Sequence, residues 1–409
     1  MTIVDRWLLP EGIEEILPNR AIKVERLRRR LLDLYHSWGY DLVIPPLAEF
    51  TESLLSGSGA DLDLMTCKII DQLSGRMMGV RADITPQVAR MDAHSLRRKG
   101  PNRLCYAGQV LYARPKSQME TRSPIQLGVE LFGEGGLEAD TEVVLLLIET
   151  LKQAGVKAIH LDLGHVGIYR GLEAQADLSE EQSRELFTLL QIKDASLQDW
   201  VKRHIKDPHI ADMVAGLPAL AGSVDVLPLA RELLANAPDT VLLALEEITS
   251  LVAAIERSVD DGEADRDRKI DIYLDLGELR GYHYHTGVVF AAYTDGSLAP
   301  LGNGGRYDHI GEVFGRPRSA TGFGVDLGLL ATLVEGEEAI APGIFVPHTD
   351  SKNVLAEVAR LRERGERVVC GFSGQVPDFV ELHCDRQLVE TKAGFALASV
   401  SAPAVNTEQ

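Results

Sequence analysis

Positive charge is scarce in this chain. Lys and Arg number 42 against 61 Asp and Glu, which gives a formal net charge of −19. A protein whose main task is to grip phosphate backbones should carry a basic excess or a basic patch. The one basic cluster, Arg28–Arg30, falls within a helical pattern, where a solvated helix face is favoured and a partner contact stays open. We therefore expect no nucleic acid as the main ligand.

Cysteine pairs and long apolar runs are also missing. The cysteines, at Cys67, Cys105, Cys370 and Cys384, are scattered with no CxxC pair, which is typical of a reducing compartment. Cys67 and Cys105 have no basic partner readable from the sequence, so we expect inert core thiols. The N-terminus lacks a basic-then-apolar segment, and no apolar run approaches about 18 residues. These absences predict a cytoplasmic protein with no membrane partner.

Metal chemistry has little support in the sequence. His283 and His285 lie on one face of a predicted strand and could form half of a metal site. No Cys, Asp or third His stands at ligand spacing nearby, so pocket or packing roles are favoured for both. We expect neither a metal ion nor a cofactor.

The stretch from Leu279 to Leu330 has the pattern of a pocket floor. Two apolar runs flank Asp295–Gly296, a pair that is typical of a tight hairpin turn. The glycine run Gly302–Gly305 lets a backbone pass very close to a ligand or another strand. Ala320–Gly324 then leads into an apolar helical run.

A long amphipathic helix precedes this stretch in the sequence. Its apolar face is formed by residues at helical spacing: Leu27, Leu31, Leu34, Tyr35 and Trp38. Gly39 is predicted to end the helix in a left-handed cap, and Tyr40–Ile44 is predicted to be a strand that stops at Pro45–Pro46. The helix and strand could belong to the core or to a dimer interface.

Two further segments carry polar groups where a pocket would need them. In Arg81–Pro86, Thr85 is predicted to cap a helix whose first residue is Pro86, with Asp83 on the bend as a capping or pocket residue. Ile125–Phe132 alternates as a strand and places Gln126 and Glu130 on one face. Such a face is either solvated or lines a polar pocket, because burying it without partners is costly.

The chain is long enough for about two or three domains. We predict a core over residues 1–330, interrupted by an all-helical insertion over about 166–266 that contains a Ser179–Gln182 capping box. Residues 331–409 are predicted to be a small C-terminal α/β domain and tail, with a strand–helix–strand unit that ends its helix at Gly365.

Several motifs in one order give a resemblance to the catalytic core of histidyl-tRNA synthetase, a class II synthetase, from about Pro10 to Leu330. The matching segments are Leu27–Pro46, Arg81–Thr85, Tyr106–Tyr112, Arg122–Phe132, Arg280–His285, Gly304–Asp308 and Ala320–Phe323. The resemblance implies an α+β fold, in which helices flank an antiparallel sheet. It also implies a homodimer built through Leu27–Pro46.

The same resemblance assigns an amino-acid pocket. Its implied ligand-binding residues are Asp83, Thr85, Arg122, Gln126, Glu130, Arg280, Tyr284 and His285. Asp83 stands where the family has glutamate, and His285 where it has tyrosine. The carboxylates could pair with an ammonium or imidazolium group, and Gln126 could serve the imidazole. A pocket that binds another ligand is an open alternative.

The ATP half of the family's site does not carry over. Tyr112 stands in place of one ATP-binding arginine, with Arg114 where a glutamate belongs, and Leu329 stands in place of the other arginine. Neither tyrosine nor leucine brings a fixed positive charge to a phosphoryl group. Losing one such donor typically costs about 100–1,000-fold in rate, so we expect that the chain performs no adenylation.

These departures, with a C-terminal part too short for an anticodon-binding domain, resemble the family of ATP phosphoribosyltransferase regulatory subunits. YHYHTG and FGRPRSATGF are similar to that family's own pattern. The resemblance implies a non-catalytic subunit of histidine biosynthesis that activates a catalytic ATP phosphoribosyltransferase in a hetero-octamer, with histidine as feedback effector. A divergent active synthetase, an adenylate enzyme with a non-tRNA acceptor, and a plain structural module are the alternatives.

Overall fold

A computed structural model describes residues 7–56, 60–115, 120–260, 269–282, 284–334, 342–392 and 394–400. The chain divides into two compact units. The larger comprises Met1–Glu15 and Val24–Glu335, and the smaller comprises Ile16–Lys23 and Gly336–Gln409.

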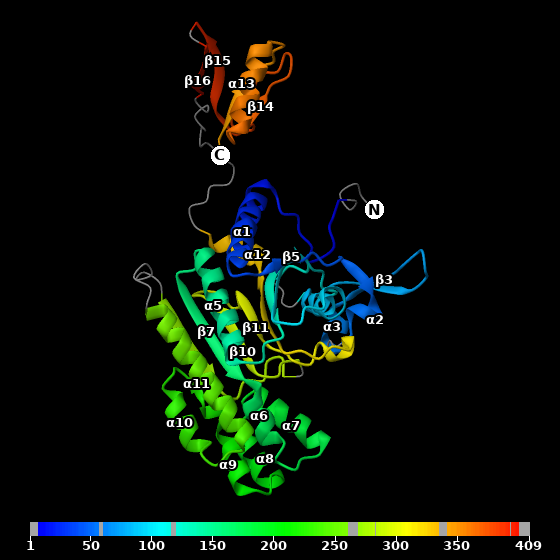
Figure 1. Ribbon diagram of the computed structural model, residues 1–409, viewed down its shortest axis with the longest axis vertical. Coiled ribbons are helices and arrows are strands. Elements are labelled where there is room, and N and C mark those ends of the chain that lie inside the picture. Colours follow the sequence, from blue (N-terminus) through cyan, green and yellow to red (C-terminus); the bar gives the residue numbers. More distant parts are fainter. Residues whose placement is uncertain are drawn as a thin grey trace. The chain divides into compact units, whose positions relative to one another are not determined.

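A mostly antiparallel sheet forms the centre of the larger unit (Figure 1). Over the described residues it has nine strands in the order β1-β5-β6-β12-β11-β10-β7-β9-β8, and only β1–β5 and β7–β9 pair in parallel. The strands are β1 (Asp41–Leu42), β5 (Asn102–Gln109), β6 (Ile125–Phe132), β7 (Ala158–His165), β8 (Ala221–Gly222), β9 (Lys269–Asp275), β10 (Val288–Tyr293), β11 (Gly302–Arg306) and β12 (Ala320–Asp326). A separate sheet pairs β4 (Met77–Val80) with β2 (Ala48–Phe50) and β3 (Cys67–Ile70).

Helices accompany the sheets throughout the larger unit. Before β7 these are α1 (Pro18–Ser37), α2 (Thr51–Leu54), α3 (Ala60–Met65), α4 (Thr85–Arg90), the π-helix η2 (Met91–Leu96) and α5 (Leu137–Gln153). After β7 come α6 (Val166–Glu173), α7 (Glu180–Gln191), α8 (Leu197–His204), α9 (Pro208–Gly216), the 3-10 turn η3 (Leu217–Ala219), α10 (Val226–Leu233) and α11 (Asp239–Asp260), which gather as one helical group in Figure 1. The 3-10 turn η5 (Glu312–Phe314) and α12 (Leu327–Leu333) complete the unit. None of the helices in the described part of the chain is long and apolar enough to cross a membrane.

The smaller unit contains β13 (Gly343–Val346), α13 (Lys352–Glu363), β14 (Val368–Cys370), β15 (Cys384–Thr391) and β16 (Gly394–Ser399). Its strands lie in the order β14-β13-β15-β16. The strand–helix–strand unit was predicted from the sequence, and Gly365 follows α13 at φ +83° as its cap requires. β15 and β16 were not predicted.

Local sequence patterns predict several of these elements correctly. The face of α1 that carries Leu27, Leu31 and Tyr35 is buried in the core, and Gly39 follows the helix at φ +84°. The alternating segment Ile125–Phe132 is β6, with the same ends. The capping box of α7 forms as predicted, with reciprocal bonds between Ser179 and Gln182. The fold is the class II synthetase-like α+β fold that the motifs imply.

Two local predictions were wrong in detail. A turn does form at Asp295–Gly296, where the Ser297 N–H donates to the Thr294 carbonyl at 3.1 Å and Gly296 has φ +76°. It does not join β10 and β11 directly, because the strands pair only from Ala292 opposite Gly302. Residues 294–301 form the longer connection, in which Pro300 has no N–H to extend the ladder. Thr85 is also not the cap of α4, since Ile84 precedes the helix and Pro86 is its second residue.

The close packing of β10, β11 and β12 depends on Gly304. An added Cβ there would lie 2.8 Å from Phe290 Cζ and 2.8 Å from Phe323 Cα, and closer still to the Gly322 carbonyl. Gly304→Ala is therefore expected to destabilise the larger unit by about 1–3 kcal/mol in urea unfolding, because backbone atoms cannot move aside. Gly100→Ala is the matched control, because a Cβ at Gly100 meets nothing within 4 Å. Equal stability of the two variants would contradict this interpretation.

Candidate functional site

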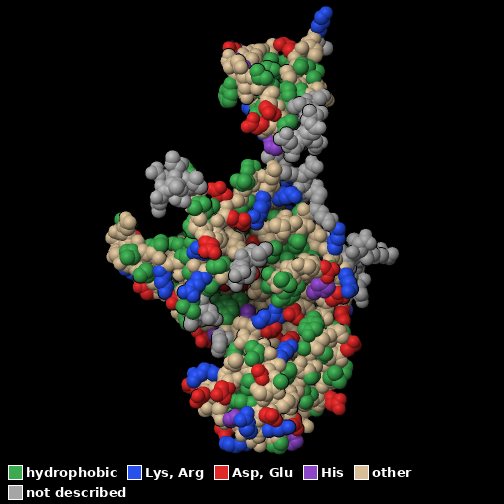
Figure 2. Space-filling model, turned by 180° about the vertical axis from the view of Figure 1, so that it is seen from behind, with side chains coloured by type: hydrophobic (Ala, Val, Ile, Leu, Met, Phe, Trp, Pro, Cys, Tyr) green, Lys and Arg blue, Asp and Glu red, His purple; other side chains and the backbone are tan. Residues whose placement is uncertain are grey.

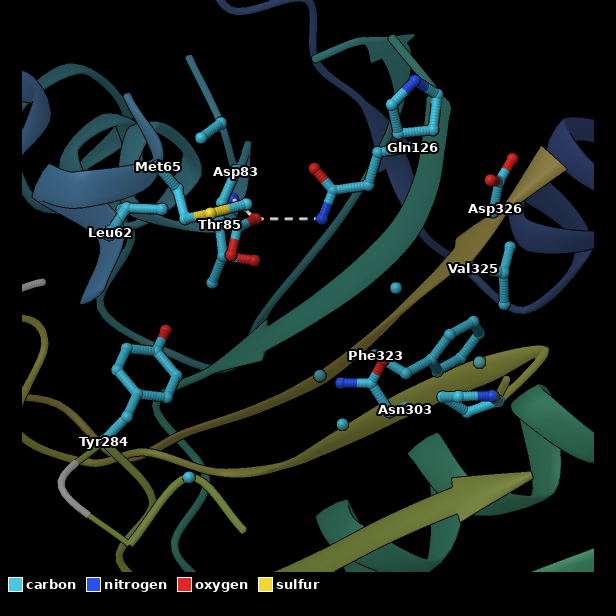
Figure 3. Close-up of a pocket in the computed structure, with 18 of the residues that line it drawn as sticks. Leu62, Met65, Asp83, Thr85, Gln126, Tyr284, Asn303, Phe323, Val325 and Asp326 are labelled. Atoms are coloured by element: carbon cyan, nitrogen blue, oxygen red, sulfur yellow. Dashed lines mark hydrogen bonds between the residues drawn. The ribbon is translucent and has the colours of Figure 1, made fainter. Parts of the chain in front are cut away.

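A cavity of about 830 Å³ opens against β6, β11 and β12 of the larger unit (Figure 3). Side chains reach it from the bend before α4, from α7, and from the segment between β9 and β10. The polar and aromatic residues among its lining are Asp83, Thr85, Tyr112, Glu120, Thr121, Gln126, Glu130, Phe187, Gln191, Tyr282, Tyr284, His285, Asn303, Tyr307, Phe323 and Asp326. The glycine-rich strands leave this space open, since Gly302, Gly304, Gly322 and Gly324 lie along its wall.

Asp83 has both of its predicted roles: it caps the bend before α4 and it lines the cavity. Its Oδ1 accepts a hydrogen bond from the backbone N–H of Thr85 at 3.0 Å, which fixes the bend before α4. The same oxygen accepts from Nε2 of Gln126 at 2.9 Å, as Figure 3 shows, while Gln126 Oε1 accepts from the Ile84 N–H at 2.9 Å. The alternation of β6 thus places Gln126 where it orients the Asp83 carboxylate toward the cavity.

Glu130, four residues beyond Gln126 on the same face of β6, is a buried carboxyl group that lines the cavity. It is 1% exposed, and its Oε1 accepts from Thr85 Oγ1 at 2.9 Å and from the Tyr106 hydroxyl at 3.1 Å. The Tyr307 hydroxyl donates to the other oxygen, Oε2. Burial raises the pKa of Glu130 to about 8, although the hydrogen bonds from Tyr307, Thr85 and Tyr106 act in the opposite direction. The face of β6 with Gln126 and Glu130 is therefore a pocket wall.

Tyr284 offers the cavity an unused hydroxyl group. Its ring stacks on Tyr307, with centroids 5.1 Å apart and planes 21° apart. Its hydroxyl oxygen is buried and has no hydrogen-bond partner among the described residues. A buried polar group of this kind normally has a partner, so the hydroxyl is available to a ligand.

His285 is a neutral side chain beside the cavity. Burial lowers the pKa of His285 to about 4, and its Nδ1 lies 3.3 Å from the carbonyl oxygen of Arg306. A neutral imidazole supplies no fixed positive charge. His283 lies outside the described residues, and within them no group of His, Cys, Asp or Glu could hold a metal ion.

Arg122 and Arg280, both predicted to contact a ligand, are not among the residues that line the cavity. Arg280 donates to Asp162 Oδ2 at 2.6 Å, to Glu278 Oε2 at 2.5 Å and to the Tyr293 hydroxyl at 2.7 Å. Arg122 donates to the Tyr112 carbonyl at 2.9 Å and to the Glu11 carbonyl at 3.1 Å. Nearby carboxylates and carbonyls thus turn both guanidinium groups toward the protein itself.

The positions Tyr112 and Leu329, by contrast, both line the cavity. The two positions where the synthetase family has an ATP-binding arginine therefore lie at the same cavity, although they are far apart in the sequence.

Comparison with known proteins matches both parts of the chain. Residues 12–330 match the histidyl-tRNA synthetase family, and residues 341–398 match the ATP phosphoribosyltransferase subunit HisZ C-terminal domain. The ATP phosphoribosyltransferase regulatory subunit of Teredinibacter turnerae is 50% identical over 402 residues, which cover 98% of this chain and all of the relative. That of Chromohalobacter salexigens is 52% identical over 392 residues, which cover 96% of this chain and 98% of the relative. The chain belongs to the ATP phosphoribosyltransferase regulatory subunit family.

Solved structures agree with this membership. An ATP phosphoribosyltransferase regulatory subunit/histidyl-tRNA synthetase from Bacillus halodurans matches with a TM-score of 0.78 and 29% identity, covering 92% of this chain and 95% of that one. Histidyl-tRNA synthetase from Nostoc matches with a TM-score of 0.72 at 17% identity, which concerns the fold alone.

In this regulatory-subunit chain, the helical group supplies cavity residues that the sequence did not reveal. Phe187 and Gln191 of α7 line the cavity beside Tyr282. Arg170 of α6 donates to the carbonyl oxygens of Tyr282 at 2.8 Å and His285 at 3.1 Å. No local signal marks these residues, because their partners lie about a hundred residues away in the chain. Tyr307 lies within the matching segment Gly304–Asp308, but the distant partner of its hydroxyl, Glu130, leaves no local signal in the sequence.

Proposed function

We propose that this chain is a non-catalytic regulatory subunit that senses histidine in the cavity and controls a catalytic ATP phosphoribosyltransferase. Its membership of the regulatory subunit family makes it a regulatory subunit of the enzyme of the first step of histidine biosynthesis. One observation carries the cavity assignment. The amino-acid side of the cavity keeps an ordered set of acceptors, while Tyr112 and Leu329 line the side where a synthetase needs arginines.

The acceptors suit the donors of histidine. Asp83 can accept a charge-assisted bond from an ammonium group, which is among the stronger hydrogen bonds, and the carboxyl group of Glu130 can accept from an imidazole N–H. Glu130 is fixed by bonds from Thr85, Tyr106 and Tyr307, so it does not need to reorganise when a ligand binds. The hydroxyl of Tyr284 adds a further donor or acceptor.

The expected loss of adenylation follows from the lack of positive charge in the described cavity lining. Developing charge on a phosphoryl group needs preorganised cations or donors, and the described lining contains no Lys or Arg side chain. The chain is therefore expected to give no histidine-dependent ATP–pyrophosphate exchange. Robust exchange would instead favour a divergent synthetase.

We further propose a homodimer through Leu27–Pro46, in a hetero-octamer with the catalytic subunit. Leu42 and Ile44 are 47% and 80% exposed on this segment, which leaves apolar surface for a second copy.

We also propose the domain division at about residue 330, with the helical insertion at about 166–266. On the face seen in Figure 2, Lys and Arg side chains are interspersed with Asp and Glu over the larger unit, which fits a protein partner in the cytoplasm better than a nucleic acid.

The test uses the chain co-purified with the catalytic phosphoribosyltransferase of the same genome. Histidine is expected to inhibit the complex, and Asp83→Asn should raise the histidine concentration for half-inhibition at least about tenfold, since a charge-assisted bond is lost. Asp177→Asn is the matched control, because Asp177 pairs with Lys206 where both side chains are at least 80% exposed. No complex, or a histidine response that Asp83→Asn leaves unchanged, would defeat the proposal.

A further inference from the structure

Carboxyl side chains from several elements line the cavity wall. The acidic side chains that line it are Asp83 before α4, Glu120 before β6, Glu130 on β6 and Asp326 at the end of β12. No Lys or Arg lies among the described residues of the lining. Figure 3 shows Asp83 and Asp326 at separate places on the wall. A ligand in this space therefore meets carboxyl groups from more than one direction.

The basic side chains that the resemblance assigned to the pocket have other partners in the structure. Arg280 is held by Asp162, Glu278 and Tyr293, and Arg122 donates to two backbone carbonyls. His285 is neutral, with its Nδ1 close to the Arg306 carbonyl. Asp326 accepts from the N–H groups of Gly328 and Leu329, so the start of α12 is already capped by a carboxylate and does not offer these two groups to an anion.

A buried, unpartnered hydroxyl independently indicates that the cavity takes a polar ligand. The Tyr284 oxygen has no partner among the described residues, although it is buried at the cavity wall. Together, these groups accept hydrogen bonds from a cation, and no Lys or Arg among the described lining residues gives a carboxylate a counter-charge.

We propose that the cavity recognises the ammonium and imidazole ends of its ligand and does not pair with a carboxylate. The preferred ligand class is then an imidazole-bearing amine without an adjacent anionic group. This inference rests on the proposed function, since it takes the cavity as the effector site. The inference restricts the ligands of that site to one class of cation. Within this class L-histidine is expected to bind more weakly, because its carboxylate faces an acidic wall.

Calorimetric titration of the full chain at neutral pH tests the inference with three probes. L-Histidinamide is expected to bind at least about fivefold more tightly than L-histidine, because the amide removes the repelled charge. Imidazole-4-propionate keeps the carboxylate and lacks the amine, so it should not bind measurably. Equal or tighter binding of L-histidine relative to the amide overturns the inference.

The variants Leu329→Arg and Tyr112→Arg test whether the preference for L-histidinamide over L-histidine arises at this cavity wall. Each variant introduces a cation into the lining and should shift the preference toward L-histidine, whereas Leu329→Met should leave it unchanged. If both arginine variants still prefer L-histidinamide to L-histidine as strongly as the unmodified chain does, the assignment to this cavity is overturned. If one of the two variants does not fold, the other alone decides the test.

The same titration separates the two proposals. If L-histidine binds more tightly than the amide and still inhibits the complex, the inference fails and the proposed function stands. If the amide is preferred while histidine has no effect on the phosphoribosyltransferase, the proposed regulation fails and the ligand class stands. If none of the probes binds, both the inference and the histidine site are overturned.

Discussion

Arg306→Met is expected to lower the free energy of unfolding of the larger unit by about 3–5 kcal/mol, because it leaves a buried charge without its partner. Arg306 at the end of β11 is 7% exposed, and Asp140 at the start of α5 is 3% exposed. Arg306 Nε and Nη2 lie 2.9 and 2.8 Å from Asp140 Oδ2. The remaining donors reach Asp308 Oδ1 at 3.3 Å and the carbonyls of Glu134 and Gly136 at 3.2 and 3.1 Å.

Urea unfolding followed by tryptophan fluorescence measures this loss. The chain's three tryptophans, Trp7, Trp38 and Trp200, all belong to the larger unit, so the signal reports that unit. Arg29→Met is the matched control, because Arg29 pairs with Glu25 at 2.8 Å with its side chain 74% exposed. Exposed pairs of this spacing contribute about 0.3–0.5 kcal/mol. A loss below about 1 kcal/mol for Arg306→Met would mean that Asp140 finds another partner or is protonated.

This ion pair also supports the cavity. The carbonyl oxygen of Arg306 accepts from the Thr286 N–H at 2.7 Å and lies 3.3 Å from Nδ1 of His285. Arg306 thus fixes β11 against α5 on one side and the segment that carries Tyr284 and His285 on the other. Loss of the pair should therefore weaken ligand binding along with stability.

Local periodicity accounts for the parts of the fold that the sequence predicted well. β6 alternates over its full length because one face meets the core and the other meets the cavity, and each face constrains its own residue types. The helix α1 can likewise be predicted from the local sequence, because its buried residues repeat at helical spacing and a glycine follows its end. Both signals lie within single segments and need no knowledge of distant neighbours.

The side-chain partners in the cavity could not be predicted in this way. Whether Arg280 faces a ligand depends on Asp162, Glu278 and Tyr293, and Asp162 lies more than a hundred residues away in sequence. Thr85 has the sequence of a helix cap, yet its hydroxyl donates to Glu130 because β6 passes beside the bend. The family resemblance supplied Asp83, Gln126 and Glu130, whereas Phe187 and Gln191 come from an insertion where the resemblance gave no assignment.

Glu130→Gln is expected to remove a large pH dependence from the stability of the larger unit. The carboxyl group has a usual pKa of 4.5, which burial raises to about 8 in the folded chain. Between these values the folded state keeps a proton that the unfolded state has lost, so the free energy of unfolding falls as pH rises. Below the lower value both states are protonated, and above the higher value the loss is complete. The whole change amounts to about 3–5 kcal/mol, since one pKa unit corresponds to about 1.4 kcal/mol.

The measurement is urea unfolding at several pH values from 4.5 to 8.5, compared as the difference between wild type and variant. Glutamine keeps the shape and stays neutral, so Glu130→Gln should lose less stability than wild type as pH rises through this range. Glu256→Gln on the exposed side of α11 is the matched control and should follow wild type at every pH. Parallel curves for Glu130→Gln and wild type would mean that the bonds from Tyr307, Thr85 and Tyr106 keep the carboxylate ionised despite its burial. The slope therefore decides whether the cavity presents a neutral acid or a fixed anion to an incoming ligand.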